Sequence, residues 1–490
     1  MPTISLSKTL FAASTFVWPP CILPLDFVKM LLRILFTFIL IQSVSLAARA
    51  SQATGTVLST AQDFEKTQWV LKHLGIAPEP ETQSEAEKLN GLQTKDGLKW
   101  NIRYLDPSNT FGRFSEVKTT ETGAELFVYQ DRDIKKVEDF HVVLSPQLVS
   151  GSLLKNLRGT SDHPLLGLRV ALDPGHMGGD YWDELTGRAV YELKGKKGRK
   201  LSEGMLTLET CLLLKNTLES LGATVFVTHE TIGPVTPEKI NDLNPATYAP
   251  QQIIESTLHP WFLSLIENNP EGPALAQAVD SSSQIKKFSS KSMRSEDFIL
   301  VEDIDARASA IEAFHPDLVL VIHYNTSDPP GDTWGLNKGY DRTGTYVAGG
   351  YESTEFSSRQ WREGFAQHLL NPSVWNASVD LSRYILASMK KNLGLLPDRS
   401  VFGGSVEIEP GIQARNLRLT RELTDYPVSY VECLYYNDPT EFAEIIKNDH
   451  VMIIGGVETP YSNRIADVSQ ALTEAVISFV KQSASISIAK

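Results

Sequence analysis

The chain has 490 residues, of which 42% are hydrophobic and 21% are charged, and its formal net charge is −13 at pH 7. This composition excludes a largely disordered chain, and the length allows two or three domains. The negative charge excludes nucleic acid as the main partner, because the chain lacks a broad basic stripe that could displace counterions from phosphates.

The amino-terminal segment has the features of an export signal. Lys29 and Arg33 flank the start of an apolar run from Ile34 to Ile41, and small residues follow it up to Ala48-Arg49-Ala50. A basic flank, a short apolar core and an A-x-A sequence are typical of secretory signals. An uncleaved anchor is the alternative, but the apolar core is shorter than the roughly 20 residues of a membrane span.

These features predict where the mature protein begins. We interpret residues 1–50 as a signal region, with translation starting at Met30 and cleavage after Ala50. The mature protein is then exported to the periplasm or cell wall, and removal of the signal leaves no stable membrane span.

Residues 51–165 carry no chemical signature. A helix-like stretch, FEKTQWVLKHLG at 64–75, precedes three strand-like stretches, KWNIRYL at 99–105, AELFVYQ at 124–130 and FHVVLSP at 140–146. Partial alternation of apolar and polar residues, with turn residues between the stretches, is typical of short strands. We therefore expect a small strand-rich amino-terminal domain of unknown role.

From Gly167 onward the pattern changes to alternating strands and helices. The apolar run LRVALDP at 168–174 is followed by the helical pattern MLTLETCLLLKNTLESLG at 205–222 and by the strand pattern ATVFVTH at 223–229. This order and these lengths are typical of a βαβ unit with parallel strands. Cys211 lies on the apolar face of this helix, and we expect it and Cys433 to be small buried residues rather than a disulfide.

The alternation resumes after an interruption at about 231–300. Further patterns are the helix DARASAIEAFHP, the strands DLVLVIHYN and PVSYVECLYYN, and the helices EFAEIIKN and IADVSQALTEAVISFVKQ. Residues 166–485 are therefore expected to form an α/β domain, an open and mostly parallel sheet with helices on both faces. The interruption, which contains the helix-like stretch 251–269, is interpreted as an insertion in this domain.

Three of the predicted strands end in residues that bind metals or move protons. These residues are His176, His323 and Glu432, and a fourth, Glu203, lies at the start of the first long helix. Ligands of open α/β sheets bind beyond the carboxyl ends of the strands, so these side chains can converge there. Two imidazoles and a carboxylate suit catalytic zinc, and a further glutamate can serve as the base in amide hydrolysis. Singly, Glu203 could be a helix-start carboxylate and Glu432 a buried acid with a hydrogen-bond partner.

Together these stretches resemble a known family. DPGHMGG, the segment that starts SEGMLTLE, DLVLVIHYNTSD and PVSYVECLYYNDPTEF resemble, in order and placement, the signature segments of zinc-dependent N-acetylmuramoyl-L-alanine amidases of bacterial peptidoglycan. The resemblance covers about 168–480. It implies Zn²⁺ as cofactor, peptidoglycan as partner, and cleavage of the amide between N-acetylmuramic acid and L-alanine.

The resemblance also implies roles for individual residues. His176, Glu203 and His323 correspond to the zinc ligands of the family, and Glu432 corresponds to its catalytic carboxylate. Asn325 matches an asparagine that follows the second histidine. Two further residues are expected to act in the surroundings of the centre: Arg415 as a substrate-binding residue, with a surface ion pair as the alternative, and Asp173 as a support of the DPGH turn.

The chain departs from the family in two places. A basic stretch, YELKGKKGRKLS, lengthens the gap before Glu203, so that Glu184, Glu192 and Glu209 are rival ligands, although the helix length from Glu203 to Gly222 favours Glu203. His229, where relatives carry arginine, is expected to be structural.

The second departure is the length of the insertion at 231–300. In some relatives a helix at this place covers the metal until an activator protein removes it. The resemblance thus implies an activator as partner, with Glu255 or Glu267 as the residue that blocks the zinc, and a packed helix as the alternative. Two other functions stay open, a non-catalytic cell-wall-binding or regulatory protein on the same fold, and a zinc peptidase that acts on stem peptides.

Overall fold

The structure is a computed structural model of the 490-residue chain. The described residues are 102–108, 110–120, 123–130, 135–144, 154, 156–186, 188–193, 196–238, 301–327, 335–351, 355–357, 359–400 and 405–488. The predicted signal region and the helix-like stretches 64–75 and 251–269 lie outside these residues.

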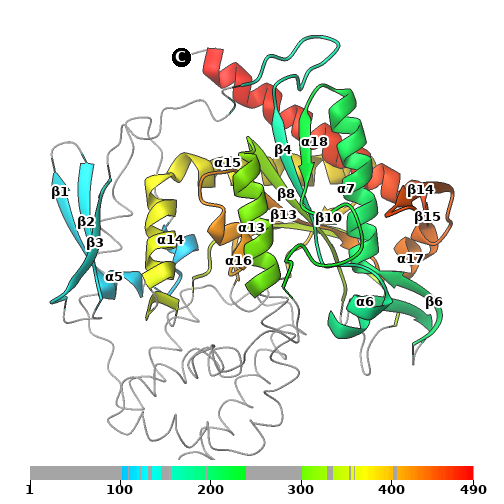
Figure 1. Cartoon of the computed structure of the whole chain (residues 1–490), viewed down its shortest axis with the longest axis horizontal. Helices are drawn as coiled ribbons and strands as arrows, with labels where there is room; N and C mark the ends of the chain where they lie inside the picture. The colour runs from blue at the N-terminus through cyan, green and yellow to red at the C-terminus, as the bar shows by residue number, and fades with distance from the viewer. Residues whose placement is uncertain are drawn as a thin grey trace, which may run out of the picture. The chain divides into compact units, whose positions relative to one another are not determined.

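A mixed eight-stranded sheet forms the centre of the described part (Figure 1). Its strands are β4 (Arg169–Pro174), β7 (Thr224–Val227), β8 (Leu318–Asn325), β9 (Arg342–Ala348), β10 (Leu396–Pro397), β11 (Ser405–Glu409), β12 (Ile412–Arg415) and β13 (Val428–Tyr435). The order is β11-β12-β9-β13-β8-β4-β7, and β10 pairs with β9. Strands β7, β4, β8 and β13 are parallel, whereas β9 runs antiparallel to β13 and β11 antiparallel to β12. The predicted open, mostly parallel sheet is confirmed.

Helices cover both faces of the sheet, as predicted (Figure 1). The first layer contains α7 (Glu203–Ser220), α15 (Pro372–Leu393) and α18 (Asn463–Ile488), and the second contains α13 (Asp303–Phe314) and α16 (Arg418–Glu422). Successive residues of strand β8 are apolar because helices cover both faces of the sheet at this strand, so side chains on either face are buried. Leu320 packs in the cluster under α7 and α15, and the next residue, Val321, packs in the cluster under α13.

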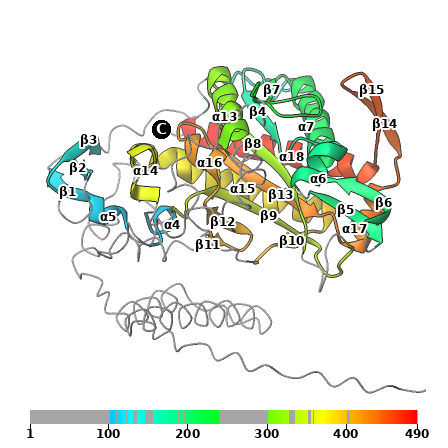
Figure 2. The same cartoon turned by 60° about the horizontal axis from the view of Figure 1, so that its bottom comes forward.

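A small strand-rich part precedes the main sheet, as predicted, and its strands form a three-stranded antiparallel sheet. It consists of β1 (Ser115–Thr120), β2 (Gly123–Tyr129) and β3 (Glu138–Leu144), and Figure 2 shows it beside α5 (Phe111–Phe114) and α14 (Arg359–Leu370). Leu126 and Val128 are buried in a cluster that also contains residues of the main sheet. The division of the chain near residue 165 stays a prediction.

One predicted strand is wrong. The stretch 99–105 was expected to be extended, but Ile102–Leu105 is a short helix, α4. Ile102 and Leu105 are three residues apart and both buried, which one helical turn achieves and a strand does not. Tyr104 stacks on Trp375 at 5.9 Å between ring centroids, so contacts with α15 stabilise this turn.

The remaining elements are short. They are α6 (Asp180–Thr186), β5 (Ala189–Leu193), β6 (Lys197–Ser202), η3 (Glu355–Ser357), α17 (Pro439–Ile445), β14 (His450–Ile454) and β15 (Val457–Tyr461). The hairpin β5–β6 contains the described part of the extra basic stretch that lengthens the gap before Glu203. None of the helices in the described ranges is long and apolar enough to span a bilayer.

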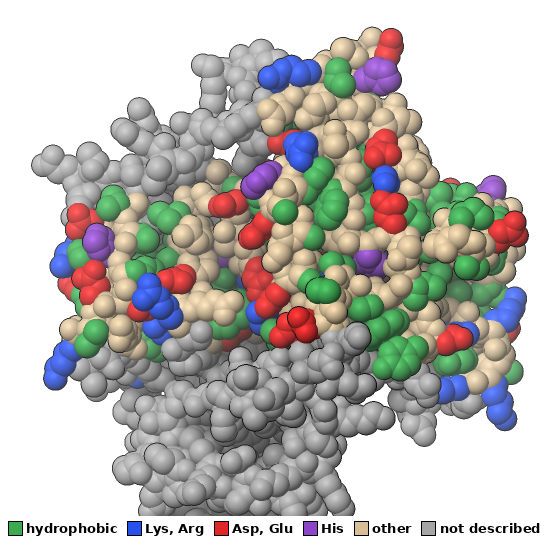
Figure 3. Space-filling model, viewed as in Figure 1, with side chains coloured by type: hydrophobic (Ala, Val, Ile, Leu, Met, Phe, Trp, Pro, Cys, Tyr) green, Lys and Arg blue, Asp and Glu red, His purple; other side chains and the backbone are tan. Residues whose placement is uncertain are grey.

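The distribution of charged side chains and the state of the two cysteines both match what the sequence predicts. On the face drawn in Figure 3, Lys and Arg side chains of the described residues are scattered among Asp and Glu, without a broad basic patch. Cys211 and Cys433 are both buried free thiols, as expected.

Candidate metal centre

The turn after β4 places His176 close to β8. Gly175 N donates a hydrogen bond to Ile322 O at 2.8 Å, and Thr207 Oγ1 donates one to Gly175 O at 2.6 Å. A Cβ on Gly175 would lie 2.2 Å from His323 Nε2, so only glycine lets the ring of His323 approach the turn. His176 itself has a left-handed backbone, with φ of 63°.

Glu203 is brought to this turn by the start of α7. Ser202 is the N-cap, and its Oγ accepts a hydrogen bond from Met205 N at 3.3 Å. A Cβ on Gly204 would lie 2.3 Å from Gly178 N, so the helix start packs directly on the chain that follows His176. The helix thus begins at Glu203, directly after the β5–β6 hairpin, which contains the described part of the extra basic stretch.

Three side chains from distant parts of the chain meet at this point. His176 Nε2 lies 3.1 Å from Glu203 Oε1, and His323 Nδ1 lies 3.0 Å from the same oxygen. One ligand atom from each residue falls within 4.8 Å of the other two. The two imidazole rings meet edge to face, with centroids 4.8 Å apart.

The donor set fits a zinc ion. Tetrahedral zinc with bonds of about 2.0 Å holds its ligand atoms roughly 3.3 Å apart, close to the separations seen here. Burial lowers the pKa of His323 to about 4, so its ring is neutral at pH 7 and offers a lone pair. Burial disfavours the charge of Glu203, but His176 and His323 outweigh it and lower the pKa of this carboxyl below its usual range.

Glu432 lies beside this group on the neighbouring strand. It pairs in register with His323 of β8 and with Gly344 of β9, and two residues earlier the ring of Tyr430 stacks on His323 at 4.2 Å. Glu432 Oε2 is buried and has no hydrogen-bond partner among the described residues. Burial and then Glu203 raise the pKa of Glu432 to about 8, and a cation held by Glu203 would favour its charged form.

Two arginines place positive charge near Glu432. Arg415 lies over the ring of Tyr346 at 4.8 Å, and both Arg415 and the exposed Arg188 act to lower the pKa of Glu432. The backbone of Arg188 is fixed, because its carbonyl accepts a hydrogen bond from Glu203 N at 3.0 Å. Sequence reasoning missed Arg188, although its place between His176 and Glu203 in the chain was a usable signal.

The rival ligands lie elsewhere. Glu192 forms an ion pair with Arg199 at 2.7 Å on the β5–β6 hairpin. Glu209 is buried farther along α7, where desolvation raises its pKa to about 8, and the side chain of Glu184 is outside the described residues. Among the described residues, three side chains lie close enough together to hold a metal: His176, Glu203 and His323. Of the four candidate glutamates, this group contains Glu203.

Other residues singled out in the sequence have local partners. Asn325 Oδ1 accepts a hydrogen bond from Thr326 N at 2.8 Å, which stabilises the chain directly after β8. His229 is buried, with Nδ1 3.5 Å from Thr228 Oγ1, and burial lowers its pKa to about 3. Tyr435 and Tyr436 are buried in the core. The predicted blocking residues Glu255 and Glu267 lie outside the described residues.

Comparison with known proteins gives matches of fold only. No family model and no curated protein matches the chain. Among solved structures, the chain is similar to the N-acetylmuramyl-L-alanine amidase Ami1 from Mycobacterium smegmatis, with 14% identity over 65% of this chain and 98% of that one, and a TM-score of 0.33.

Two further solved structures match with similar identity, coverage and TM-score. The CwlD amidase from Clostridioides difficile, in complex with the GerS lipoprotein, matches with 14% identity over 64% of this chain and 98% of that one, with a TM-score of 0.34. The amidase AmiC2 of Nostoc punctiforme matches with 12% identity over 64% and 97%, with a TM-score of 0.31. The three solved structures named here are N-acetylmuramoyl-L-alanine amidases, and the function of this chain has to be inferred from its own centre.

Proposed function

We propose that the protein is an exported zinc hydrolase that cleaves the amide between N-acetylmuramic acid and L-alanine in peptidoglycan. One observation carries the proposal. His176, Glu203 and His323 converge from three elements, and Glu432 lies beside them on the next strand, with its Oε2 buried and without a hydrogen-bond partner among the described residues. A metal-binding group next to a buried acid is the arrangement that metal-assisted amide hydrolysis needs.

The residues of the centre have separate roles in this reaction. His176, Glu203 and His323 would hold the ion, which when bound supplies a Lewis acid for the carbonyl and lowers the pKa of water. Glu432 accepts the proton from water and passes it to the leaving amine, a role that suits an acid with a raised pKa. Tyr430 stacks on His323 and holds its ring in place.

The surroundings of Glu432 support an anionic peptide as the substrate. Arg188 and Arg415 both favour negative charge at the position of Glu432, although the whole chain carries a net charge of −13. Carboxylates of a stem peptide would be drawn to these two guanidinium groups. We propose Arg188, Arg415 and Asn325 as substrate-binding residues on the peptide side of the scissile amide.

The choice of the muramoyl amide rests on the resemblance of the DPGH, HYN and VE segments to the amidase family, since the metal chemistry would serve other amides equally. The signal region at 1–50 supports export, and the length of the insertion at 231–300 supports an activator protein that acts on it. Both belong to the proposal.

Mass spectrometry of products from purified peptidoglycan tests this function. The zinc-loaded protein should release stem peptides with a free L-alanine amino terminus and leave glycan chains with a free lactyl carboxyl. A chelator should abolish release, and added Zn²⁺ should restore it. Cleavage within peptide crosslinks would instead identify a zinc peptidase, and wall binding without product would identify a non-catalytic protein.

A further inference from the structure

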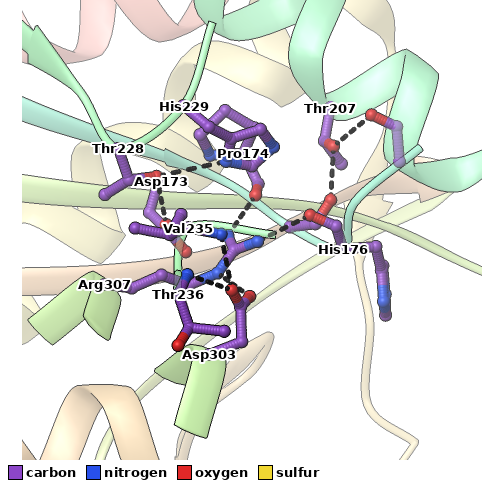
Figure 4. A network of polar contacts seen from close by, with 12 residues as sticks. Asp173, Pro174, His176, Thr207, Thr228, His229, Val235, Thr236, Asp303 and Arg307 are labelled. Atoms are coloured by element: carbon purple, nitrogen blue, oxygen red, sulfur yellow. Dashed lines mark hydrogen bonds and ion pairs between the residues drawn. The ribbon is translucent and has the colours of Figure 1, made fainter. Parts of the chain in front are cut away.

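A second buried cluster lies directly behind the DPGH turn. Arg307 of α13 is 4% exposed, and its guanidinium faces the turn (Figure 4). Nη1 donates to Asp173 Oδ1 at 2.9 Å and to Pro174 O at 2.6 Å, and Nη2 donates to His176 O at 2.7 Å. One side chain therefore contacts three residues of the turn that ends in the metal-binding histidine.

The backbone of this turn needs outside support. His176 has a φ of 63°, in the left-handed region that disfavours residues with a Cβ. Such conformations persist where surrounding contacts overdetermine them, and they cluster at functional sites. The hydrogen bond from Arg307 to the carbonyl of His176 is a contact of this kind.

The guanidinium is itself held in place from the other side. Asp303, one turn before Arg307 in α13, accepts a hydrogen bond from Arg307 Nε at Oδ2, 2.7 Å away. Asp303 Oδ1 accepts hydrogen bonds from Val235 N at 2.6 Å and Thr236 N at 3.1 Å, in the segment after β7. Thr228 Oγ1 donates to Asp173 Oδ1 at 2.6 Å. These contacts are all made between protein groups.

We propose that Arg307 is a positioning residue of the metal centre, which fixes the backbone of residues 173–176 and thereby aims the imidazole of His176 at Glu203 and His323. The inference rests on the proposed role of His176 as a metal ligand. It adds that α13, which contributes no ligand, determines how well the three ligands fit one ion. The chemistry concerned is binding of a divalent cation such as Zn²⁺.

The planar guanidinium explains why arginine occupies this position. Its five N–H donors point in fixed directions, so one group can serve Asp303, Asp173 and two carbonyls together. A lysine keeps the positive charge but offers a single ammonium that cannot span these acceptors. Arg307→Lys therefore separates the geometry of the contacts from their charge.

Another buried arginine provides a matched control. Arg362 of α14 is 3% exposed, and its Nη2 pairs with Asp139 Oδ2 of β3 at 2.8 Å. Its Nη1 donates to Phe356 O at 2.7 Å. Arg362→Lys makes the same chemical change at an Arg–Asp pair with a carbonyl contact, in the part of the chain that supports the small sheet.

The test is a metal titration of the full mature chain. Zn²⁺ affinity is measured by competition with a chelating dye, and the visible bands of bound Co²⁺ report the ligand geometry. Arg307→Lys should weaken Zn²⁺ binding by about 10- to 100-fold, as loss of contacts behind a metal ligand does, and should change the Co²⁺ bands. Arg362→Lys should leave both at wild-type values. Equal affinity in Arg307→Lys and wild type, or an equal loss in both variants, would overturn the inference.

A milder variant covers the case in which Arg307→Lys does not fold. Asp303→Asn keeps the acceptor for Val235 and Thr236 but weakens the hold on Arg307, so Zn²⁺ affinity should fall in the same direction by a smaller factor. Unchanged affinity in folded Asp303→Asn would also overturn the inference. A wild-type chain that binds no Zn²⁺ contradicts the proposed function instead, and the two failures are thereby distinguished.

Discussion

Two buried groups of charged residues meet at the turn from Asp173 to His176, and their polar atoms are satisfied to different extents. Behind the turn, Arg307 pairs with Asp173 and Asp303, and it also donates to the carbonyl groups of Pro174 and His176. In front of the turn, Glu203 is shared by two imidazoles, and Oε2 of Glu432 has no partner among the described residues.

The difference separates a structural cluster from a reactive one. A buried polar atom without a hydrogen bond costs free energy, so each one needs an explanation. In front of the turn, Oε2 of Glu432 is left without a partner among the described residues, and the explanation we favour is its place beside three side chains that could hold a metal. The predictions below test this division, from the largest expected effect to the smallest.

Removal of the Glu432 carboxyl should have the largest effect. Glu432→Gln should lower the turnover of peptidoglycan by about 10²- to 10⁴-fold, the usual contribution of a general base. The thermal unfolding midpoint should stay or rise, because burial disfavours the charge of Glu432 and raises its pKa to about 8. Product release and thermal unfolding are measured on the same preparation.

Glu209→Gln is the matched control for this variant. Burial raises the pKa of Glu209 to about 8 as well, but Glu209 lies outside the metal-binding group. Turnover should stay at the wild-type level in this variant. Wild-type turnover in Glu432→Gln, or an equal loss in both, would remove the distinction between the two buried acids.

Filling the space at Gly175 should disturb the proposed metal centre without removing any of its three proposed ligands. A Cβ there would meet His323 Nε2 at 2.2 Å, so the ring of His323 must move. Gly175→Ala should cost about 1–3 kcal/mol of stability and weaken Zn²⁺ binding by about tenfold or more. In the interior of α14, Gly364→Ala has room for its methyl group and should leave Zn²⁺ affinity unchanged.

The sequence could predict that His176, Glu203 and His323 come together, but not which contacts hold them there. His176, His323 and Glu432 follow apolar runs, so the strand ends were visible, and Ser202 marks the helix start at Glu203. The antiparallel strand β9 and the helix α4 depend on packing between distant segments, which local patterns do not report. Arg307 is 134 residues from Asp173, and nothing in its own helical stretch distinguishes it from a surface arginine.

A buried histidine far from the centre should make stability depend on pH. His368 hydrogen-bonds Arg421 O through Nε2 at 3.1 Å, and burial lowers its pKa from 6.5 to about 4. The unfolded chain therefore binds a proton that the folded chain does not, so this stability is complete above pH 6.5 and is lost as the pH falls toward 4. The loss amounts to about 3 kcal/mol.

Denaturant unfolding of metal-free protein at several pH values measures this effect. His368→Gln keeps a donor for Arg421 O and should reduce the slope between pH 6.5 and 4, to which His229 and His323 also contribute because burial lowers their pKa in the same direction. His141→Gln, at an exposed position of β3, should leave the dependence as it is. A wild-type slope in His368→Gln would mean that other groups cause the acid sensitivity.

The smallest effect is expected at the exposed arginine. Arg188→Ala should raise KM for peptidoglycan about two- to fivefold with little change in kcat, since an exposed charge pair is worth up to about 1 kcal/mol. The effect should shrink at high salt. Arg199→Ala removes an arginine that Glu192 already pairs on the same part of the chain, and it should not change KM. Equal KM shifts in the two variants would argue for general charge rather than a contact of Arg188.

The central claim is that His176, Glu203 and His323 hold one metal ion. Anomalous X-ray diffraction from crystals of zinc-loaded protein, recorded on both sides of the zinc absorption edge, tests this claim most directly. We predict a single strong peak within bonding distance of one donor atom from each of the three residues, next to Glu432. A peak at another group of residues, or none in protein with stoichiometric zinc added, would contradict it.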